Sequence, residues 1–152
     1  EEADINKIVE DAVKAMQTQA DNAGVDVLRN YGKDMPNIRS GNLFQVFCNL
    51  IKNACDAMPG GGRLEITTLC NDHHAVMEFA DTGTGLSTEV RDKLFDAFFT
   101  TKPTGKGTGL GLAICKDIVE RYSGQITADN RPQGGAVFRI AIPLERTSRG
   151  QV

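Results

Sequence analysis

The sequence predicts an α+β fold, a two-layer sandwich in which a mixed β-sheet packs against about three helices. Three segments repeat apolar residues at helical spacing, and five shorter segments have the composition of strands. No internal repeat and no linker interrupts the 152 residues, which is about the length of one ordinary domain. We therefore expect a single domain over residues 1–152.

The first half of the chain contains two of the expected helices. Residues 4–20 place apolar side chains at helical spacing, and Asp4 is suited to cap the start. Residues 25–31 alternate as a strand does. A second helix, capped by Asn42, spans about 42–58 and stops at a proline and three glycines.

The second half supplies the other strands and the third helix. The expected strands are 63–70, 74–80, 125–130 and 136–143. A short helix is expected near 87–94, and an amphipathic helix over 109–123 that Gly124 ends. Residues 95–108 show no regular period, and 144–152 are expected to fray as a tail.

The charge and hydropathy of the chain exclude two classes of partner. Seventeen Lys and Arg against twenty Asp and Glu give a net charge of −3, whereas nucleic-acid binding needs a basic surface. No apolar run approaches the roughly 18 residues of a membrane-spanning helix. We expect neither nucleic acid nor a direct membrane contact.

The four cysteines are widely spaced, no CxxC pair occurs, and only two histidines are present. This pattern argues against a zinc site and favours buried, reduced thiols in a cytoplasmic domain. Because the chain begins at Glu1 without a methionine, we expect it to be part of a longer protein.

Three polar side chains share one narrow face of the helix at 42–58. At about 100° per residue, Asn53 lies ~40° and Asp56 ~20° from Asn49, on opposite sides of it. A solvated helix surface explains this face equally well. The functional alternative is oxygen ligation of Mg²⁺, which takes few protein oxygens together with phosphates and waters.

A carboxylate followed by two glycines comes directly after the strand at 74–80. Asp81 is an acceptor for an exocyclic amine such as that of adenine, and Gly83 and Gly85 let backbone approach a flat ligand. An ordinary turn has the same composition, so this motif alone is weak.

A glycine-rich segment, 105–111, precedes the last helix. Uncovered N–H groups at a helix N-terminus favour phosphate. The order of residues is neither that of a dinucleotide-binding turn nor that of a phosphate-binding P-loop. The aromatic and basic residues before it indicate a lid, in which Lys102 and Lys106 can screen the terminal phosphate, although solvated lysines are the commoner case.

Together these motifs resemble the catalytic ATP-binding domain of sensor histidine kinases, within the GHKL superfamily of ATPases and kinases. The matching segments are NLIKNACDA (49–57), DTGTGL (81–86), LFDAFFTTK (94–102), GTGLGLAICKDIVERYSGQI (107–126) and GGAVFRIAIP (134–143). The resemblance covers residues 4–143, and its wording is most similar to the nitrogen-regulation and dicarboxylate-sensing class.

The resemblance implies the fold of this superfamily, with a flexible ATP lid at about 95–108, and it implies ATP and Mg²⁺ as ligands. It makes Asn53 the Mg²⁺ ligand and Asp81 the acceptor of the adenine amine, with Asn49 and Lys102 beside the phosphates as the catalytic residues. The implied nucleotide-binding residues are Asn49, Asn53, Asp56, Asp81, Gly83, Gly85, Lys102, Gly107, Thr108, Gly109, Leu110 and Gly111.

Asn49 separates the subfamilies. Hydrolytic members and serine kinases carry a glutamate at this position as general base, and an amide cannot take a proton. A neutral imidazole already has a lone pair and needs less help, so Asn49 favours phosphorylation of histidine. A GHKL hydrolase or serine kinase is the second hypothesis, and a nucleotide-gated interaction module is the third.

The phosphoacceptor histidine of such kinases lies in a separate dimerisation domain. The two histidines here, His73 and His74, fall at the expected turn before the strand at 74–80, and we interpret them as solvent-facing. The resemblance therefore implies two partners, a dimerisation domain of the same parent chain and a response regulator, with low activity for this domain alone. Any membrane anchor belongs to the parent.

Overall fold

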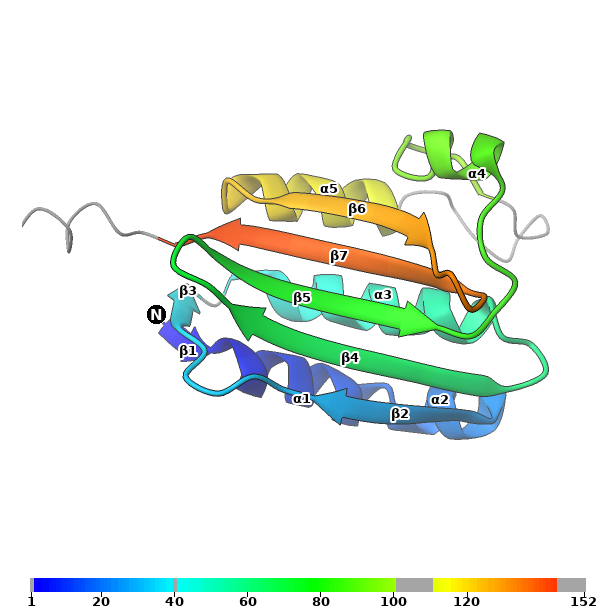
Figure 1. Cartoon of the computed structure of the whole chain (residues 1–152), viewed down its shortest axis with the longest axis horizontal. Coiled ribbons are helices and arrows are strands. Elements are labelled where there is room, and N and C mark those ends of the chain that lie inside the picture. Colours follow the sequence, from blue (N-terminus) through cyan, green and yellow to red (C-terminus); the bar gives the residue numbers. More distant parts are fainter. Residues whose placement is uncertain (1, 40, 101–110, 145–152) are drawn as a thin grey trace, which may run out of the picture.

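The structure is a computed structural model that describes residues 2–39, 41–100 and 111–144. A five-stranded mixed sheet forms one layer, and helices cover one of its faces (Figure 1). In spatial order the strands are β2 (Val25–Asn30), β4 (Gly62–Cys70), β5 (His74–Asp81), β7 (Ala136–Pro143) and β6 (Gln125–Asn130). β2 and β4 are parallel, and the other neighbours are antiparallel. The expected two-layer α+β sandwich is confirmed.

The helices differ in how they meet this sheet (Figure 1). They are α1 (Ile5–Ala15), α2 (Gln17–Ala23), α3 (Leu43–Asp56), α4 (Thr88–Lys93) and α5 (Gly111–Arg121). Helices α1, α2, α3 and α5 lie behind the sheet, whereas α4 lies at its right-hand end. The described residues contain five helices: the three expected to pack on the sheet, one of which is divided in two, and the short helix expected near 87–94.

The helix expected over 4–20 is divided at Met16. Asp4 caps its start as predicted, accepting a hydrogen bond from the backbone N–H of Asn6 at 2.9 Å. Met16 adopts φ −100° and ψ 6°, outside helical geometry, and helix α2 then runs to Gly24 at φ 73°. In α2 only Ala20 is buried, so the second piece has no apolar stripe to keep it in line with α1.

Two other expectations about helix ends were wrong. The side chain of Asn42 makes no capping hydrogen bond, although it occupies the N-cap position of α3. The left-handed residue after α5 is Ser123, at φ 62°, rather than Gly124. Glycine is required at 124 for space, because a Cβ there would lie 2.7 Å from the carbonyl oxygen of Ala141.

A second, two-stranded sheet was not predicted. β1 (Glu2–Asp4) pairs antiparallel with β3 (Asn37–Arg39). Each strand has three residues, which is too short for a recognisable alternation. The pairing places the start of the chain beside the segment that leads into α3 (Figure 1).

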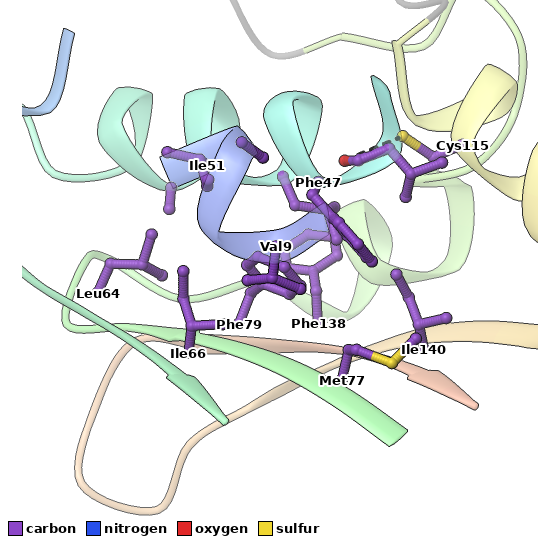
Figure 2. Close-up of a cluster of buried hydrophobic side chains, with 14 of the residues drawn as sticks. Val9, Phe47, Ile51, Leu64, Ile66, Met77, Phe79, Cys115, Phe138 and Ile140 are labelled. Carbon is purple, nitrogen blue, oxygen red and sulfur yellow. Dashed lines mark hydrogen bonds between the residues drawn. The ribbon is translucent and has the colours of Figure 1, made fainter. Parts of the chain in front are cut away.

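The core lies between helices α1, α3 and α5 and the sheet (Figure 2). The Phe47 ring of α3 stacks on the Phe79 ring of β5, with the centroids 5.7 Å apart. The side chains expected on the core side of the helix at 42–58 are all buried: Leu43, Phe47, Ile51, Ala54 and Met58, the last of which lies just beyond the end of α3. The polar face of α3 therefore points away from the sheet, with Asn49 and Asn53 half-buried and Asp56 exposed.

Candidate functional site

The loop that follows β5 meets the end of α3 and the β6–β7 hairpin at one end of the strands, on the right in Figure 1. Asp81 is the last residue of β5. The backbone of the loop passes so close to α3 that a Cβ on Gly83 would collide with the carbonyl oxygen of Ala57. The structure therefore brings Asp81 and the end of α3 together.

Asp81 is a buried carboxylate with one oxygen engaged, and its residue is only 2% exposed. Its Oδ1 accepts hydrogen bonds from the backbone N–H of Gly83 at 2.9 Å and of Ala136 at 3.1 Å. Within the part of the chain that the structure describes, Oδ2 accepts none. Two backbone donors thus fix the orientation of the carboxylate and leave Oδ2 as an acceptor for an amine.

The two glycines after Asp81 lie in close contact with other parts of the chain. Gly83 lies against the C-cap residue of α3, Ala57, as described above. Gly85 has φ 79°, and a Cβ there would lie 2.8 Å from Oδ1 of Asn130. In the structure these glycines allow the loop to pack closely against α3 and β6. This is a role in addition to the one we expected, which was to let the backbone approach a flat ligand.

Asn49 is joined to helix α5. Its Nδ2 donates a hydrogen bond to Sγ of Cys115 at 3.5 Å, and this sulfur donates in turn to the carbonyl oxygen of Val46 at 3.9 Å. Burial raises the pKa of the Cys115 thiol to about 11, and the hydrogen bond from Asn49 opposes part of that rise. The thiol is therefore neutral at physiological pH, and Asn49 meets no charge there.

Asp56 turns toward the other side of α3. Its Oδ2 lies 3.3 Å from Nζ of Lys52, and both side chains are more than 40% exposed. This pair borders an open hollow of about 400 Å³ between α2 and α3, lined by Gln19, Asn22, Ala23, Lys52, Cys55 and Asp56. The three polar residues of α3 thus share one helix, but Asn49 faces α5 whereas Asp56 faces α2.

Part of the predicted site lies outside the described residues: Lys102, Lys106, Gly107, Thr108, Gly109 and Leu110. Gly111 opens α5, and a Cβ there would meet no atom of the described residues within 4 Å. Of the expected lid, residues 95–100 are described. Phe95 packs edge-to-face on Phe138 with the centroids 6.4 Å apart, whereas Phe98 is 74% exposed.

Some residues at this end of the strands, next to Asp81, were missed by the sequence analysis. Asn130 and Arg131, at the start of the β6–β7 hairpin, bond to the loop after β5. Cys115 was noted as a buried thiol but not as the partner of Asn49. The sequence carries no local signal for such contacts, since their partners lie 44 to 66 positions away.

The expected exposure of the two histidines is confirmed. His73 and His74 are exposed, and Oδ1 of Asn71 accepts from both of their backbone N–H groups at 2.8 Å. Among residues 2–39, 41–100 and 111–144, no group of three or more His, Cys, Asp or Glu side chains is placed to hold a metal. The same residues include no helix with the length and apolarity needed to cross a membrane.

Comparison with known proteins defines the family. A family model described as "Histidine kinase-, DNA gyrase B-, and HSP90-like ATPase" matches residues 39–146. The chain belongs to this family, and its fold is that of the histidine kinase catalytic domains.

One curated relative and one solved catalytic domain make this more specific. The chain is 36% identical over 141 residues to sporulation kinase A of Bacillus subtilis (strain 168), covering 91% of this chain and 23% of that kinase. It superimposes on the catalytic domain of histidine kinase ThkA with a TM-score of 0.83 and 27% identity, covering 94% of this chain and 96% of that domain. The chain thus spans about a quarter of the curated kinase and nearly all of the solved catalytic domain.

Two larger assemblies contain the same fold. ThkA in complex with the response regulator protein TrrA matches with a TM-score of 0.79 and 25% identity, covering 94% of this chain and 41% of the ThkA chain. Full-length ShkA in complex with AMPPNP matches with a TM-score of 0.82 and 25% identity, covering 94% of this chain and 30% of ShkA.

Proposed function

We propose that this domain binds Mg-ATP and transfers the γ-phosphate to a histidine on a separate dimerisation domain, from which it passes to an aspartate of a response regulator. The observation that carries the proposal is the buried carboxylate of Asp81, whose Oδ1 is held by two backbone N–H groups while Oδ2 is available to a ligand amine. The relationship to histidine kinases and the ShkA complex with an ATP analogue support it.

In this proposal the adenine amine donates to Oδ2 of Asp81, with the loop of Gly83 and Gly85 around it. Asn49 faces the phosphates, and Asp56 bonds within the pocket despite its pairing with Lys52. Lys102 reaches the terminal phosphate. The glycine-rich segment completes the phosphate side through Gly107, Thr108, Gly109, Leu110 and Gly111.

The residues present fit Mg²⁺. The α3 face offers amide oxygens and no dense carboxylate cluster, which suits an ion held by few protein oxygens together with phosphates. Asn53, half-buried on this face, is the ligand we assign. When bound, Mg²⁺ neutralises charge on the phosphates.

Asn49 is the reason for proposing histidine rather than water as the acceptor of phosphate. Its side-chain amide donates to the neutral thiol of Cys115 and has no basic atom to take a proton. A neutral imidazole attacks the γ-phosphorus with its own lone pair, the bond to the β-phosphate oxygen breaks, and ADP leaves. The chain's own residues position the phosphates for this attack.

The acceptor histidine comes from another domain in this proposal. His73 lies exposed in the β4–β5 turn and His74 lies exposed at the start of β5, while Asp81 is at the opposite end of that strand. The ThkA complex with a response regulator supports a second partner downstream. We also infer a cytoplasmic location, since free thiols are stable there, with any membrane anchor carried by the parent chain.

The test is phosphotransfer from γ-labelled ATP. The domain is mixed with candidate dimerisation domains, and label that is acid-labile and base-stable is expected on the partner. A partner whose acceptor histidine is replaced by alanine, and a His73→Ala, His74→Ala variant of this chain, are the controls. Acid-stable, base-labile label would indicate a serine kinase, and release of phosphate alone would indicate a hydrolase.

A further inference from the structure

Asn130, the last residue of β6, pairs with the backbone of the loop that follows Asp81. Its Oδ1 accepts from the N–H of Leu86 at 2.6 Å, and its Nδ2 donates to the carbonyl oxygen of Leu86 at 2.8 Å. A primary amide presents one acceptor and one donor side by side, as the C=O and N–H of a single residue do in a β-strand. Asn130 thus pairs with Leu86 in the way that a residue of an adjacent strand would.

Arg131 holds the other end of the same loop. Its Nη1 donates to the backbone carbonyl oxygen of Asp81 at 2.7 Å. Its own backbone is fixed by a tight turn, in which its N–H donates to Gly135 at 2.8 Å and its carbonyl oxygen accepts from Gly134 at 3.1 Å. Two successive residues of one hairpin therefore hold the first and last residues of the segment 81–86.

Glycines on both sides make this approach possible. A Cβ on Gly85 would lie 2.8 Å from Oδ1 of Asn130, and Gly85 adopts φ 79°. On the hairpin, a Cβ on Gly135 would overlap the carbonyl oxygen of Asp81, and Gly135 adopts φ 90°. Gly85 therefore provides the space for the contact with Asn130, and Gly135 provides the space for the contact with Asp81. A residue with a side chain at either position would push the loop and the hairpin apart.

We propose that Asn130 and Arg131 are positioning residues that hold segment 81–86 in its nucleotide-binding conformation and so set selectivity for the adenine amine. The inference rests on the proposed function, because it assigns the purine to Asp81. If the loop is released, only the fraction of molecules with the correct conformation binds, and the apparent affinity falls by that fraction. Discrimination between an amine and a carbonyl at the purine ring also falls, because the N–H of Gly83 no longer helps to hold the carboxylate of Asp81 in its orientation.

The experiment compares binding of ATP and of inosine triphosphate, which has a carbonyl in place of the amine, by calorimetry. For Asn130→Ala we expect ATP affinity to fall about 5- to 30-fold, as the loss of two hydrogen bonds permits. For Arg131→Ala we expect about 3- to 10-fold, with partial rescue by Arg131→Lys. The preference for ATP over inosine triphosphate should shrink in both alanine variants, whereas the Mg²⁺ dependence of binding should not change.

Gln133→Ala is the matched control, since Gln133 is exposed in the same hairpin. In the unmodified chain, the Leu86 amide should exchange slowly with solvent, a measurement that needs no variant. The inference would be overturned if the alanine variants kept the wild-type preference for ATP over inosine triphosphate, or if the Leu86 amide exchanged rapidly. Neither result would contradict the proposed function. A wild-type domain that binds no ATP would instead overturn the proposed function.

Discussion

The side-chain amide of Asn49 on α3 donates a hydrogen bond to Sγ of Cys115 on α5. Cys115 is fully buried at the contact between these helices (Figure 2). A polar residue of the proposed phosphate side is thus oriented by a residue of the hydrophobic core, which links nucleotide affinity to packing between two helices.

Replacing Cys115 with valine tests this link. Valine has a similar volume but no acceptor, so Asn49 loses its partner while the core stays filled. We expect Mg-ATP affinity to fall about 2- to 10-fold, as the loss of one weak hydrogen bond permits, with a melting temperature close to that of the wild type. Calorimetry gives the affinity, and Cys70→Ser is the control, since Cys70 is exposed on β4. An affinity equal to that of the wild type would show that Asn49 does not need this contact.

Asp81→Asn separates binding from folding. An asparagine keeps an acceptor at the Oδ1 position for the Gly83 and Ala136 N–H groups, so the domain should remain folded. The amide NH2 group that replaces Oδ2 would face the adenine amine, so two hydrogen-bond donors would meet and no hydrogen bond could form between them. We expect ATP affinity to fall by about two orders of magnitude or more, since a buried donor is left unsatisfied as a hydrogen bond is lost. Unchanged calorimetric binding would refute the adenine assignment.

Asn53→Ala tests the metal ligand. If Asn53 contributes an oxygen to Mg²⁺, the variant should lose about tenfold in affinity for ATP with Mg²⁺ and much less without it. Titrations with and without EDTA measure the two affinities. Gln45→Ala, an exposed position on the same helix, is the matched control. Equal losses under both conditions would remove the ligand role from Asn53.

Glu10 stabilises the fold in a pH-dependent way. Its carboxylate accepts from Nε and Nη2 of Arg29, at 2.8 and 3.1 Å, and from the Tyr31 hydroxyl at 2.8 Å, joining α1 to the edge strand β2. The hydrogen bond from Arg29 lowers the pKa of Glu10, although partial burial opposes this. A lowered pKa means that the contribution is present at neutral pH and is lost as the pH falls through the folded-state value.

We therefore expect Glu10→Gln to lower the free energy of unfolding by about 0.5–1 kcal/mol at pH 7 and by much less near pH 3. Urea denaturation of the wild type and the variant at both pH values measures the difference. Lys7 and Asp11 form an exposed pair on the same helix, and Asp11→Asn is the control. A difference that stays constant with pH would contradict the role assigned to the Glu10 carboxylate.

The features that the sequence predicted are those that local pattern determines. The buried side of α3 follows from helical spacing, and all five of its expected core residues are buried. The strands of the main sheet lie within one or two residues of their expected positions, and Asp81, expected directly after the strand at 74–80, is the last residue of β5.

The features that were missed depend on contacts between distant segments or on single backbone angles. The pairing of β1 with β3 joins residues 2–4 to residues 37–39 through main-chain groups that every residue possesses. The break at Met16 is a change of backbone angles within an otherwise helical pattern. The partners of Asn49 and Asp81 on α5 and the β6–β7 hairpin could not be read from either segment alone.

Asp81 continues a row of side chains in β5 that faces the helices: Ala75, Met77 and Phe79, exposed by 0%, 0% and 1%, precede it at alternate positions. The parity of the pleat therefore decides which way the carboxylate points. A single residue inserted or deleted between Phe79 and Asp81 would turn the carboxylate to the open side of the sheet without changing any residue of the site. Chain length within this one strand is thus as much a determinant of the site as the identity of its side chains.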